Sequence, residues 1–324
     1  MDRVEALVSA TSEPAADVLS EILRGIRLEG TARTRCELLE PWGPEAAISP
    51  AAEFHLIVAG SRWLQWAGAR TPRQFEAGDL VVFPHGDAHA LFSPHDAART
   101  PAAEVLRGRK LDDFGSAVLG GEGKRTEIIC GFFRVRSARP HPLIQALPGL
   151  IHLRHRDTRD TLWLRSVANL LTHEINAVQQ GTHAAIDRLV EILFIYAVRA
   201  YASTSRPAQG FLAALSDHHI GRALNLMQAR LSEPWTLESL AREVALSRAA
   251  FAGRFQRLVR EAPMSYLARQ RMERAYELLT TTGLSVAQVA GHVGYASEAA
   301  FARAFKKTTG RGPGEARRGA MEAA

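Results

Sequence analysis

Apolar residues follow two different periods along the chain, and the change between them predicts two kinds of structure. Up to about residue 135 they form short runs separated by Gly and Pro, a pattern typical of β-strands joined by turns. One helix is predicted ahead of the strands, at 17–28. From about residue 158 the apolar residues recur every three or four positions, which predicts helices near 162–178 and 186–201.

A break in this helical pattern predicts a linker at 206–217 between two domains, 1–205 and 218–318. The chain has 324 residues, enough for two domains that each bury a core. The expected fold class is therefore α+β, with an N-terminal β-barrel, a helical pair at about 160–202 and an all-helical C-terminal domain. The helical pair either covers the barrel or joins two copies of the chain in a homodimer.

The C-terminal third repeats one pattern of small, polar and aromatic residues. In each copy a short helix, a turn and a second helix that begins at a serine are predicted. In the second copy Ser285 and Gln288 also fit a capping box. Two such units in tandem are typical of a double helix-turn-helix. The recurring positions are Ser247, Ala249, Ala250, Phe251, Phe255 and Pro263, which return as Ser297, Ala299, Ala300, Phe301, Phe305 and Pro313.

The second helix of each unit is predicted to face DNA with its polar side. Its two Phe residues, four positions apart, are expected in the core, with stacking on single-stranded bases as the weaker alternative. Residues on the outward face have side chains that can contact base edges in a major groove: Arg248, Ala249, Gly253 and Gln256 in the first unit, and Glu298, Ala299 and Arg303 in the second. Phosphate contacts are predicted for Arg254, Arg257, Lys306, Lys307, Arg317 and Arg318.

The distribution of charge agrees with a nucleic-acid partner. From Arg206 onward there are 17 Lys/Arg against 10 Asp/Glu, whereas the first 205 residues hold 23 against 24. The whole positive excess therefore lies in the helical third. A third helix predicted at 265–279 would span roughly 22 Å and hold the two units apart. The chain is therefore expected to contact two adjacent major grooves of double-stranded DNA.

Four segments mark the helical third: LARE-V-LSRAAF-RF, R-ERAYELL, SVAQVA-HVGY-SEAAFARAFK and GRGP. In these segments, over about 100 residues at 218–318, the chain resembles the AraC/XylS family of transcriptional regulators. The resemblance implies a base-contacting role for Arg303, which matches an Arg of the family. Two positions depart from the family pattern: Gly253 stands where a base-contacting Arg is usual, and Ala316 where a late Tyr is usual.

Residues 78–89 fit G-x5-P-x-G-x2-H, the second motif of cupin barrels, which would place His89 inside the barrel. With this motif the N-terminal half resembles the cupin-containing branch of these regulators. The resemblance implies that a Glu and histidines of a first motif join it, and the sequence offers Glu53 and His55. These three residues are candidates for a 2-His-1-carboxylate metal site. The alternative is that both histidines are hydrogen-bonded inside the barrel and bind no metal.

The chain has two cysteines, Cys36 and Cys130. Since some members of this branch respond to oxidants through cysteine, the resemblance makes both thiols candidate redox sensors, with Arg33 and Arg35 expected to favour the thiolate of Cys36. The alternative for Cys130 is a small buried apolar residue. So few cysteines argue against a disulfide framework, and the acidic N-terminus does not resemble a signal peptide. A cytoplasmic, nucleoid-associated location is expected.

These features together predict a one-component, sequence-specific transcriptional regulator whose N-terminal domain senses a small molecule or an oxidant. RNA polymerase is an expected partner if the output is activation. No cofactor and no enzymatic activity are expected, because the chain lacks a Ser/His/Asp arrangement, a Gly-rich phosphate loop and a C-x-x-C zinc spacing. Two alternatives stay open: a cupin metalloenzyme fused to a DNA-binding tail, and a non-specific architectural DNA protein, which the mixed Glu and Arg on the outward faces disfavour.

Overall fold

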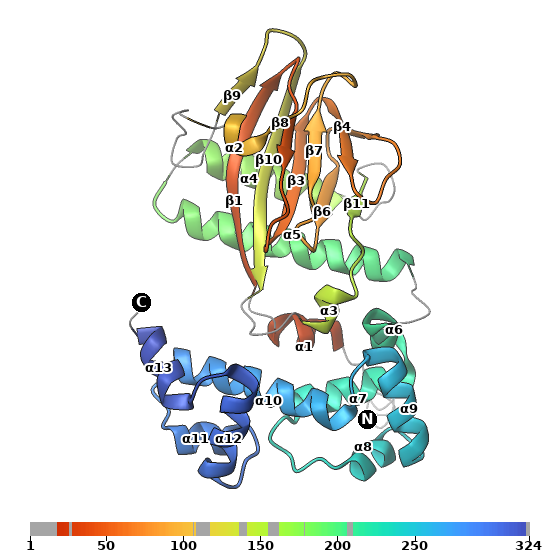
Figure 1. Cartoon of the computed structure of the whole chain (residues 1–324), viewed down its shortest axis with the longest axis vertical. Helices are drawn as coiled ribbons and strands as arrows, with labels where there is room; N and C mark the ends of the chain where they lie inside the picture. Colours follow the sequence, from red (N-terminus) through yellow and green to blue (C-terminus); the bar gives the residue numbers. More distant parts are fainter. Residues whose placement is uncertain are drawn as a thin grey trace, which may run out of the picture. The chain divides into compact units, whose positions relative to one another are not determined.

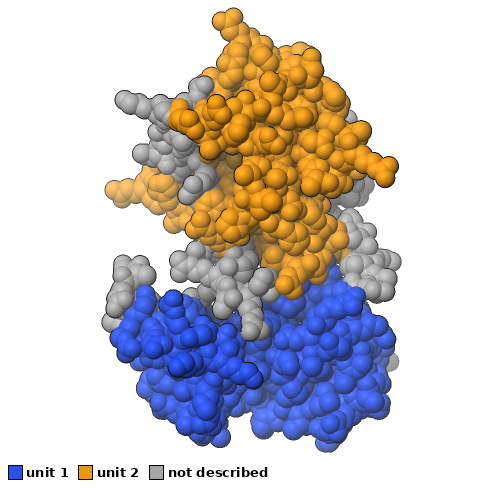
Figure 2. Space-filling view, viewed as in Figure 1, with its two compact units in different colours: residues 1–26, 137–142, 206–324 blue, residues 27–136, 143–205 orange. Residues whose placement is uncertain are grey.

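Figure 1 shows a computed structural model of the chain. It describes residues 18–25, 28–105, 107, 117–135, 141–154, 162–177, 179–205 and 210–321. The chain divides into two compact units (Figure 2). The barrel unit comprises residues 27–136 and 143–205. The helical unit comprises 206–324 together with 1–26 and 137–142. The sequence pattern placed the whole of 1–205 in one domain, so the compact units assign two short N-terminal segments differently.

The barrel unit is built from two β-sheets in which most strand pairs are antiparallel. One has the strand order β11-β6-β3-β10-β1-β9 and the other the order β5-β4-β7-β2-β8. The strands of the first sheet are β1 (Leu28–Leu39), β3 (Ala52–Ala59), β6 (Leu80–Phe83), β9 (Ala117–Gly120), β10 (Arg125–Val135) and β11 (Ile151–Leu153). Those of the second are β2 (Pro44–Ala46), β4 (Ser61–Trp66), β5 (Arg73–Glu76), β7 (His89–Phe92) and β8 (Thr100–Pro101).

Alternation along the strands decides which side chains lie between the two sheets. On β4, Arg62, Leu64 and Trp66 are buried while the residues between them are partly exposed. On β3 and β10, register pairs Cys130 with His55 and Ile128 with Ile57, so these four side chains share one face. The interior is therefore apolar except for a few polar groups at fixed positions.

Helices cover the other face of the first sheet (Figure 1). The helix α5 (Thr182–Ser205) packs against β1, β10 and β11, and α4 (Leu162–Ala177) packs against α5. Phe133 of β10 contacts both Phe54 and Phe194, with ring centroids 5.0 Å apart in each pair. In chain order, the short helix α2 (Ala102–Val105) lies between β8 and β9, and α3 (Pro142–Gln145) lies between β10 and β11. The helical pair predicted from the apolar period is confirmed.

The helical unit contains two helix-turn-helix pairs and one long connecting helix. The first pair is α8 (Leu237–Glu243) and α9 (Arg248–Val259), and the second is α11 (Val286–His292) and α12 (Glu298–Thr309). The connecting helix α10 (Pro263–Thr281) contacts α9, α11 and α12. Its 19 residues correspond to a length of about 28 Å, longer than predicted. The remaining helices are α1 (Val18–Gly25), α6 (Phe211–Ser216), α7 (His218–Ala229) and α13 (Pro313–Met321).

Two of these helices differ from the sequence-based expectation, one in its length and one in its presence. The predicted helix at 17–28 is shorter: α1 ends at Gly25, and Leu28 already begins β1. Helix α1 packs against α7 and brings Ile22, which is fully buried, into the helical unit. The stretch predicted as linker contains α6, which packs against α7 and α9 and whose Phe211 and Leu212 are buried. Helix α6 was missed because its six residues are too few to show the apolar period of a helix.

Helix starts in this unit are fixed by side-chain caps, as predicted. Ser247 and Ser297 accept from the backbone N–H of the third residue of α9 and α12, and Ser285 and Gln288 form a reciprocal capping box. Within the described ranges, no helix has the length and apolar character that crossing a bilayer requires.

Candidate DNA-reading surface and barrel histidine cluster

The residues predicted to contact bases lie on the outer faces of α9 and α12. Arg248, Ala249, Gly253 and Gln256 are exposed on α9, and Glu298, Ala299 and Arg303 are exposed on α12. Phe251, Phe255, Phe301 and Phe305 are fully buried on the opposite faces, which agrees with their predicted place in the core. Packing of the four rings therefore fixes which side of each helix faces outward.

The basic residues predicted to contact phosphate fall into two groups. Arg257, Lys306, Lys307 and Arg318 are exposed. Arg254 instead forms an ion pair with Asp217, with 2.8 Å between its Nε and the carboxylate Oδ2. Arg317 donates to the carbonyl of Leu284. Arg254 and Arg317 thus hold α9 and α13 in place, so the first group offers the free charges for phosphate among the residues predicted for that role.

Asp217 is a functional residue of the fold that the sequence analysis missed. Its Oδ1 accepts from the N–H groups of His219 and Ile220 at the start of α7, while Oδ2 accepts from Arg254 of α9. Burial alone would raise the pKa of Asp217, but these hydrogen bonds from Ile220, Arg254 and His219 hold it below its ordinary value. An Asp directly before the apolar pattern of α7 was the available signal.

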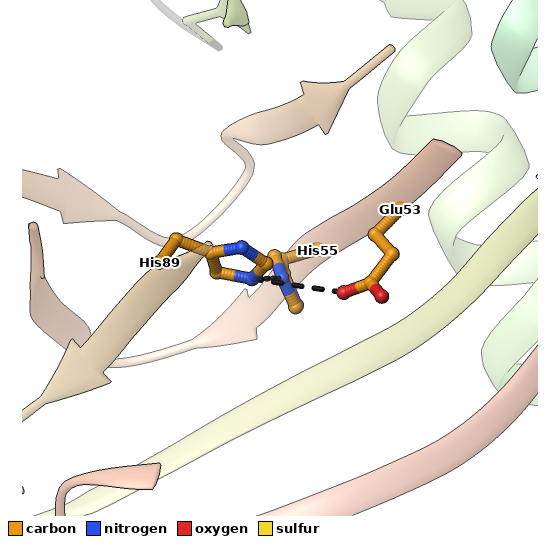
Figure 3. Close-up of side chains that lie close together, drawn as sticks. All are labelled: Glu53, His55 and His89. Atoms are coloured by element: carbon orange, nitrogen blue, oxygen red, sulfur yellow. Dashed lines mark hydrogen bonds and ion pairs between the residues drawn. The ribbon is translucent and has the colours of Figure 1, made fainter. Parts of the chain in front are cut away.

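The second site lies inside the barrel, where Glu53, His55 and His89 point toward one another (Figure 3). The two Nε2 atoms of the histidines are 2.6 Å apart, and His89 Nε2 lies 3.9 Å from a Glu53 carboxylate oxygen. One ligand atom from each of the three residues lies within 4.8 Å of the others. The structure therefore brings together all three residues predicted as metal candidates.

Hydrogen bonds around the two rings determine where their protons lie. His89 Nδ1 is 2.8 Å from the carbonyl oxygen of Asp87, which can only accept, so His89 carries its proton there. The neutral ring then accepts at Nε2 from His55 Nε2–H. His55 Nδ1 in turn accepts from the thiol of Cys130, whose sulfur is 3.0 Å away. The result is a hydrogen-bonded series in which Cys130 donates to His55, His55 donates to His89, and His89 donates to the carbonyl oxygen of Asp87.

Burial keeps the histidines of this hydrogen-bonded series neutral. It lowers the pKa of His55 well below the ordinary value, with further lowering by His89 and Arg62, and it lowers the pKa of His89. Burial also raises the pKa of Glu53, an effect that a hydrogen bond with Ser49 opposes. A metal ion would require both Nε2 lone pairs, and His55 would then donate from Nδ1 to Cys130. With that change of tautomer the donor set fits a three-ligand site.

The two thiols differ from the expectation for reactive cysteines. Burial raises the pKa of Cys36 to about 11 and also raises that of Cys130. Arg35 is occupied by Glu127, with 2.7 Å between Nε and Oε1, and the side chain of Arg33 lies outside the described residues. The prediction that neighbouring arginines favour the thiolate of Cys36 is therefore wrong. The two cysteines do lie on adjacent strands, where Thr34 opposite Cys130 precedes Cys36 by two positions.

Comparisons with known proteins agree with this architecture. Residues 17–203 match the family model described as cupin, and residues 240–319 match the one described as a helix-turn-helix domain. The HTH-type transcriptional regulator AlkR of Acinetobacter baylyi is 32% identical over 92% of this chain and 97% of its own length. The HTH-type transcriptional regulator MtrA of Neisseria gonorrhoeae is 25% identical over 93% of this chain and 98% of its own length.

Among solved structures, the DNA-binding domain of AdpA in complex with a target DNA is 31% identical to this chain. The match covers 33% of this chain and 96% of that one, with a TM-score of 0.32. The cupin match spans more than half of the chain, and the AlkR match covers nearly the whole of both proteins. The chain therefore belongs to the AraC family of HTH-type transcriptional regulators, with a cupin-like N-terminal domain and a C-terminal DNA-binding domain.

Proposed function

We propose that this regulator uses α9 and α12 to read two adjacent major grooves of one DNA duplex. The observation that carries the proposal is the pair of exposed polar faces, each fixed by buried Phe residues on its other side and both joined to α10. Major grooves on one side of B-form DNA recur about every 34 Å, close to the roughly 28 Å length of α10. Mixed Glu and Arg on α12 favour base reading over contact with phosphates alone.

The test compares the full chain on duplexes that contain a selected site with duplexes of random sequence, at one fixed salt concentration. Genome-wide mapping of bound sites, with and without an oxidant, supplies the selected sequence. A sequence-specific regulator binds its site at least about a thousandfold more tightly than random DNA. Equal affinity for both duplexes would favour an architectural role and contradict the proposal.

The barrel unit is proposed to sense a small molecule or an oxidant, with Cys130 as the oxidant-sensitive group. Support comes from the hydrogen bond between its thiol and His55 Nδ1, which links Cys130 to the histidine cluster, so that a change at the sulfur alters the hydrogen bonds of that cluster. Hydrogen peroxide would transfer one oxygen atom to the sulfur, giving a sulfenic acid and water. Trapping of that acid in the full chain, lost in Cys130→Ser and kept in Cys36→Ser, tests the proposal. Inert thiols in the folded protein would refute it.

A metal-dependent function is the second candidate, and the convergence of Glu53, His55 and His89 is what favours it. A bound divalent ion would supply Lewis acidity or redox chemistry to this interior. The charge of Arg62 acts against a cation there, as its effect on His55 indicates. Metal analysis of the purified full chain, repeated with His89→Ala, distinguishes the possibilities. Stoichiometric metal that disappears in the variant, followed by turnover of a substrate, would support the metalloenzyme.

Homodimerisation through α4 and α5 is also proposed. Leu162 and Leu170 are exposed on α4, 67% and 50% respectively, and Ile192 is partly exposed on α5. Pairing of two such faces would bury these apolar side chains. Measurement of the mass in solution tests this, and a monomer at micromolar concentration would count against it. Contact with RNA polymerase is proposed for the case in which the regulator activates transcription.

A further inference from the structure

The two helix-turn-helix pairs are joined by more than the helix α10 that runs between them (Figure 1). The loop that leads from α7 into the first pair, residues 230–235, also lies against the turn of the second pair. In this loop the carbonyl oxygens of Leu231 and Glu233 accept from Nε and Nη2 of Arg271, which lies near the middle of α10. Between these two residues, the backbone of Ser232 approaches Gly294 in the turn of the second pair.

Gly294 shows how closely the loop and the second turn approach each other. A Cβ added to Gly294 would lie 2.5 Å from the carbonyl oxygen of Ser232 and 3.0 Å from Nη2 of Arg271. Gly294 has a φ of 80°, yet the corresponding residue of the first turn is Ala245, which carries a Cβ at a φ of 53°. Since the first turn accepts an alanine in left-handed backbone, the space taken by Ser232 is the stronger reason for glycine in the second.

Arg271 lies between the loop and the second turn. Its planar guanidinium donates to two carbonyl oxygens at once, an arrangement that the single ammonium of a lysine cannot reproduce. Tyr295, the residue after Gly294, interacts electrostatically with the same guanidinium. The ring of Tyr295 packs against that of Phe301, a core residue of the second pair, with 5.8 Å between the centroids. One side chain of α10 therefore connects both ends of the DNA-binding domain.

The loop moves with the first pair because α7, which precedes it, packs against both α8 and α9. A second hydrogen bond ties α7 to α10 next to Arg271: Gln228 donates to Gln270, with 2.6 Å between Nε2 and Oε1. On its other side α10 packs against α11 and α12 of the second pair. The first pair, the loop, the second turn and α10 therefore form a closed ring of contacts.

We propose that Arg271 is a positioning residue that fixes the distance and angle between α9 and α12, and thereby the spacing between the two DNA segments that the regulator accepts. The inference rests on the proposed reading of two adjacent major grooves and adds the residue that sets their separation. Two rigidly joined helix-turn-helix pairs bind together only when the DNA presents both grooves at the matching distance and rotation. Loss of the second connection would leave α10 as the remaining link.

The first experiment binds the full chain to selected sites in which base pairs are inserted between the two segments. Each inserted base pair moves the second segment by about 3.4 Å and rotates it by roughly 35°. In the wild type one insertion should lower the affinity at least about tenfold, because the two pairs can no longer engage together. In Arg271→Gln the best spacing should bind more weakly, but the loss per insertion should fall to about threefold or less.

Arg274→Gln is the matched control, because Arg274 lies on the same helix, is exposed and pairs with Glu277. It removes the same charge, so it should change the affinity equally at every spacing. Arg271→Lys keeps the charge but reaches one carbonyl oxygen only, so its spacing dependence should lie between those of the wild type and Arg271→Gln. A wild type without sequence preference would contradict the proposed function. A sequence-specific wild type with the same spacing dependence as both Arg271 variants would overturn this inference alone.

A second measurement needs no DNA. Spin labels attached through unnatural amino acids at positions 257 and 307, both exposed on α9 and α12, report the distance between the two pairs in the full chain. Pulsed electron paramagnetic resonance should give one narrow distance distribution for the chain with Arg271 and for Arg274→Gln, and a broader one for Arg271→Gln. Equal widths in all three would show that α10 alone holds the pairs in place and would overturn the inference.

Discussion

The exposed side chains of α9 and α12 differ in chemistry although the two helices repeat one pattern of buried residues. Two residues before the second buried Phe, α12 presents Arg303 to solvent, whereas α9 presents Gly253. An arginine at this position has a side chain that can donate hydrogen bonds to a base edge, whereas a glycine has none. Specificity in the second unit is therefore expected to exceed that in the first.

Arg303→Ala and Lys306→Ala form a matched pair on the exposed side of α12. Loss of Arg303 should cost about 1–3 kcal/mol on the selected site and relax base choice at one position. Loss of Lys306 should weaken all sequences similarly and reduce the slope of log affinity against log salt by about one. Titrations of both variants on specific and random duplexes measure this. Identical effects on the two duplexes for both variants would contradict the assigned roles.

Gly253 allows a test by gain of function. It is exposed in the middle of α9, and a Cβ added there meets no atom within 4 Å. Gly253→Ala should stabilise the helical unit by about 0.5–1 kcal/mol because it removes helix-interior glycine. Gly253→Arg should share that gain and also create a preference at one base position. Selection from a duplex library compares the two variants, and identical preferences would show that this position does not face DNA bases.

At the scale of elements, the contact between Asp217 and Arg254 joins the start of α7 to the middle of α9. Because the pKa of Asp217 is lowered in the folded protein, its stabilisation is complete above the ordinary value of 3.8 and is lost as the pH falls below it. Asp217→Ala should cost about 0.5–2 kcal/mol through the lost cap.

Asp217→Asn is the control for this prediction, since an amide oxygen can still cap α7 but carries no charge. The difference in unfolding free energy between the wild type and Asp217→Asn should shrink as the pH falls through and below 3.8. Chemical unfolding at several pH values measures it. A difference that stays constant with pH would mean that the carboxylate does not titrate with folding.

Local signals explain which elements were predictable. Ser247, Ser285 and Ser297 mark helix starts within three residues of their hydrogen-bond partners, so the sequence suffices to place them. The residues of the cupin motif predicted the convergence of His55 and His89. Arg254 could not be assigned in this way, because its partner Asp217 is 37 positions away. In the sequence alone, both residues are equally compatible with unpaired positions on the surface. The burial of Arg62 depends on strand pairing, which a single sequence leaves open.

At the scale of the whole molecule, the helical unit includes two segments from the N-terminal half of the chain. Helix α1 directly precedes β1 and packs against α7, and residues 137–142 directly follow β10. Strands β1 and β10 pair along their length, with Leu28 opposite Val135 at the end. His141 is 4% exposed and its ring meets that of Phe211, with 5.9 Å between the centroids. Along the sequence, one of these segments therefore precedes β1 and the other follows β10, its partner strand.

Ile22 tests the role of α1 in the helical unit. It is fully buried, so Ile22→Ala should destabilise this unit by about 2–5 kcal/mol, whereas Ile22→Val should cost about 0.5–1.5 kcal/mol. Hydrogen exchange of the full chain should show faster exchange of α7 amides in the Ala variant and little change in the barrel strands. Faster exchange confined to the barrel strands would place α1 with the other unit.

The two N-terminal segments in the helical unit affect how such a regulator can be recombined during evolution or engineering. A fragment that starts at residue 206 carries both helix-turn-helix pairs but lacks Ile22 and His141, each of which fills part of its interior. Grafting that fragment onto a foreign sensor would leave apolar surface uncovered on α7 and around Phe211. A functional chimera would have to include the two segments, 1–26 before β1 and 137–142 after β10, or replace them with other residues that cover this surface.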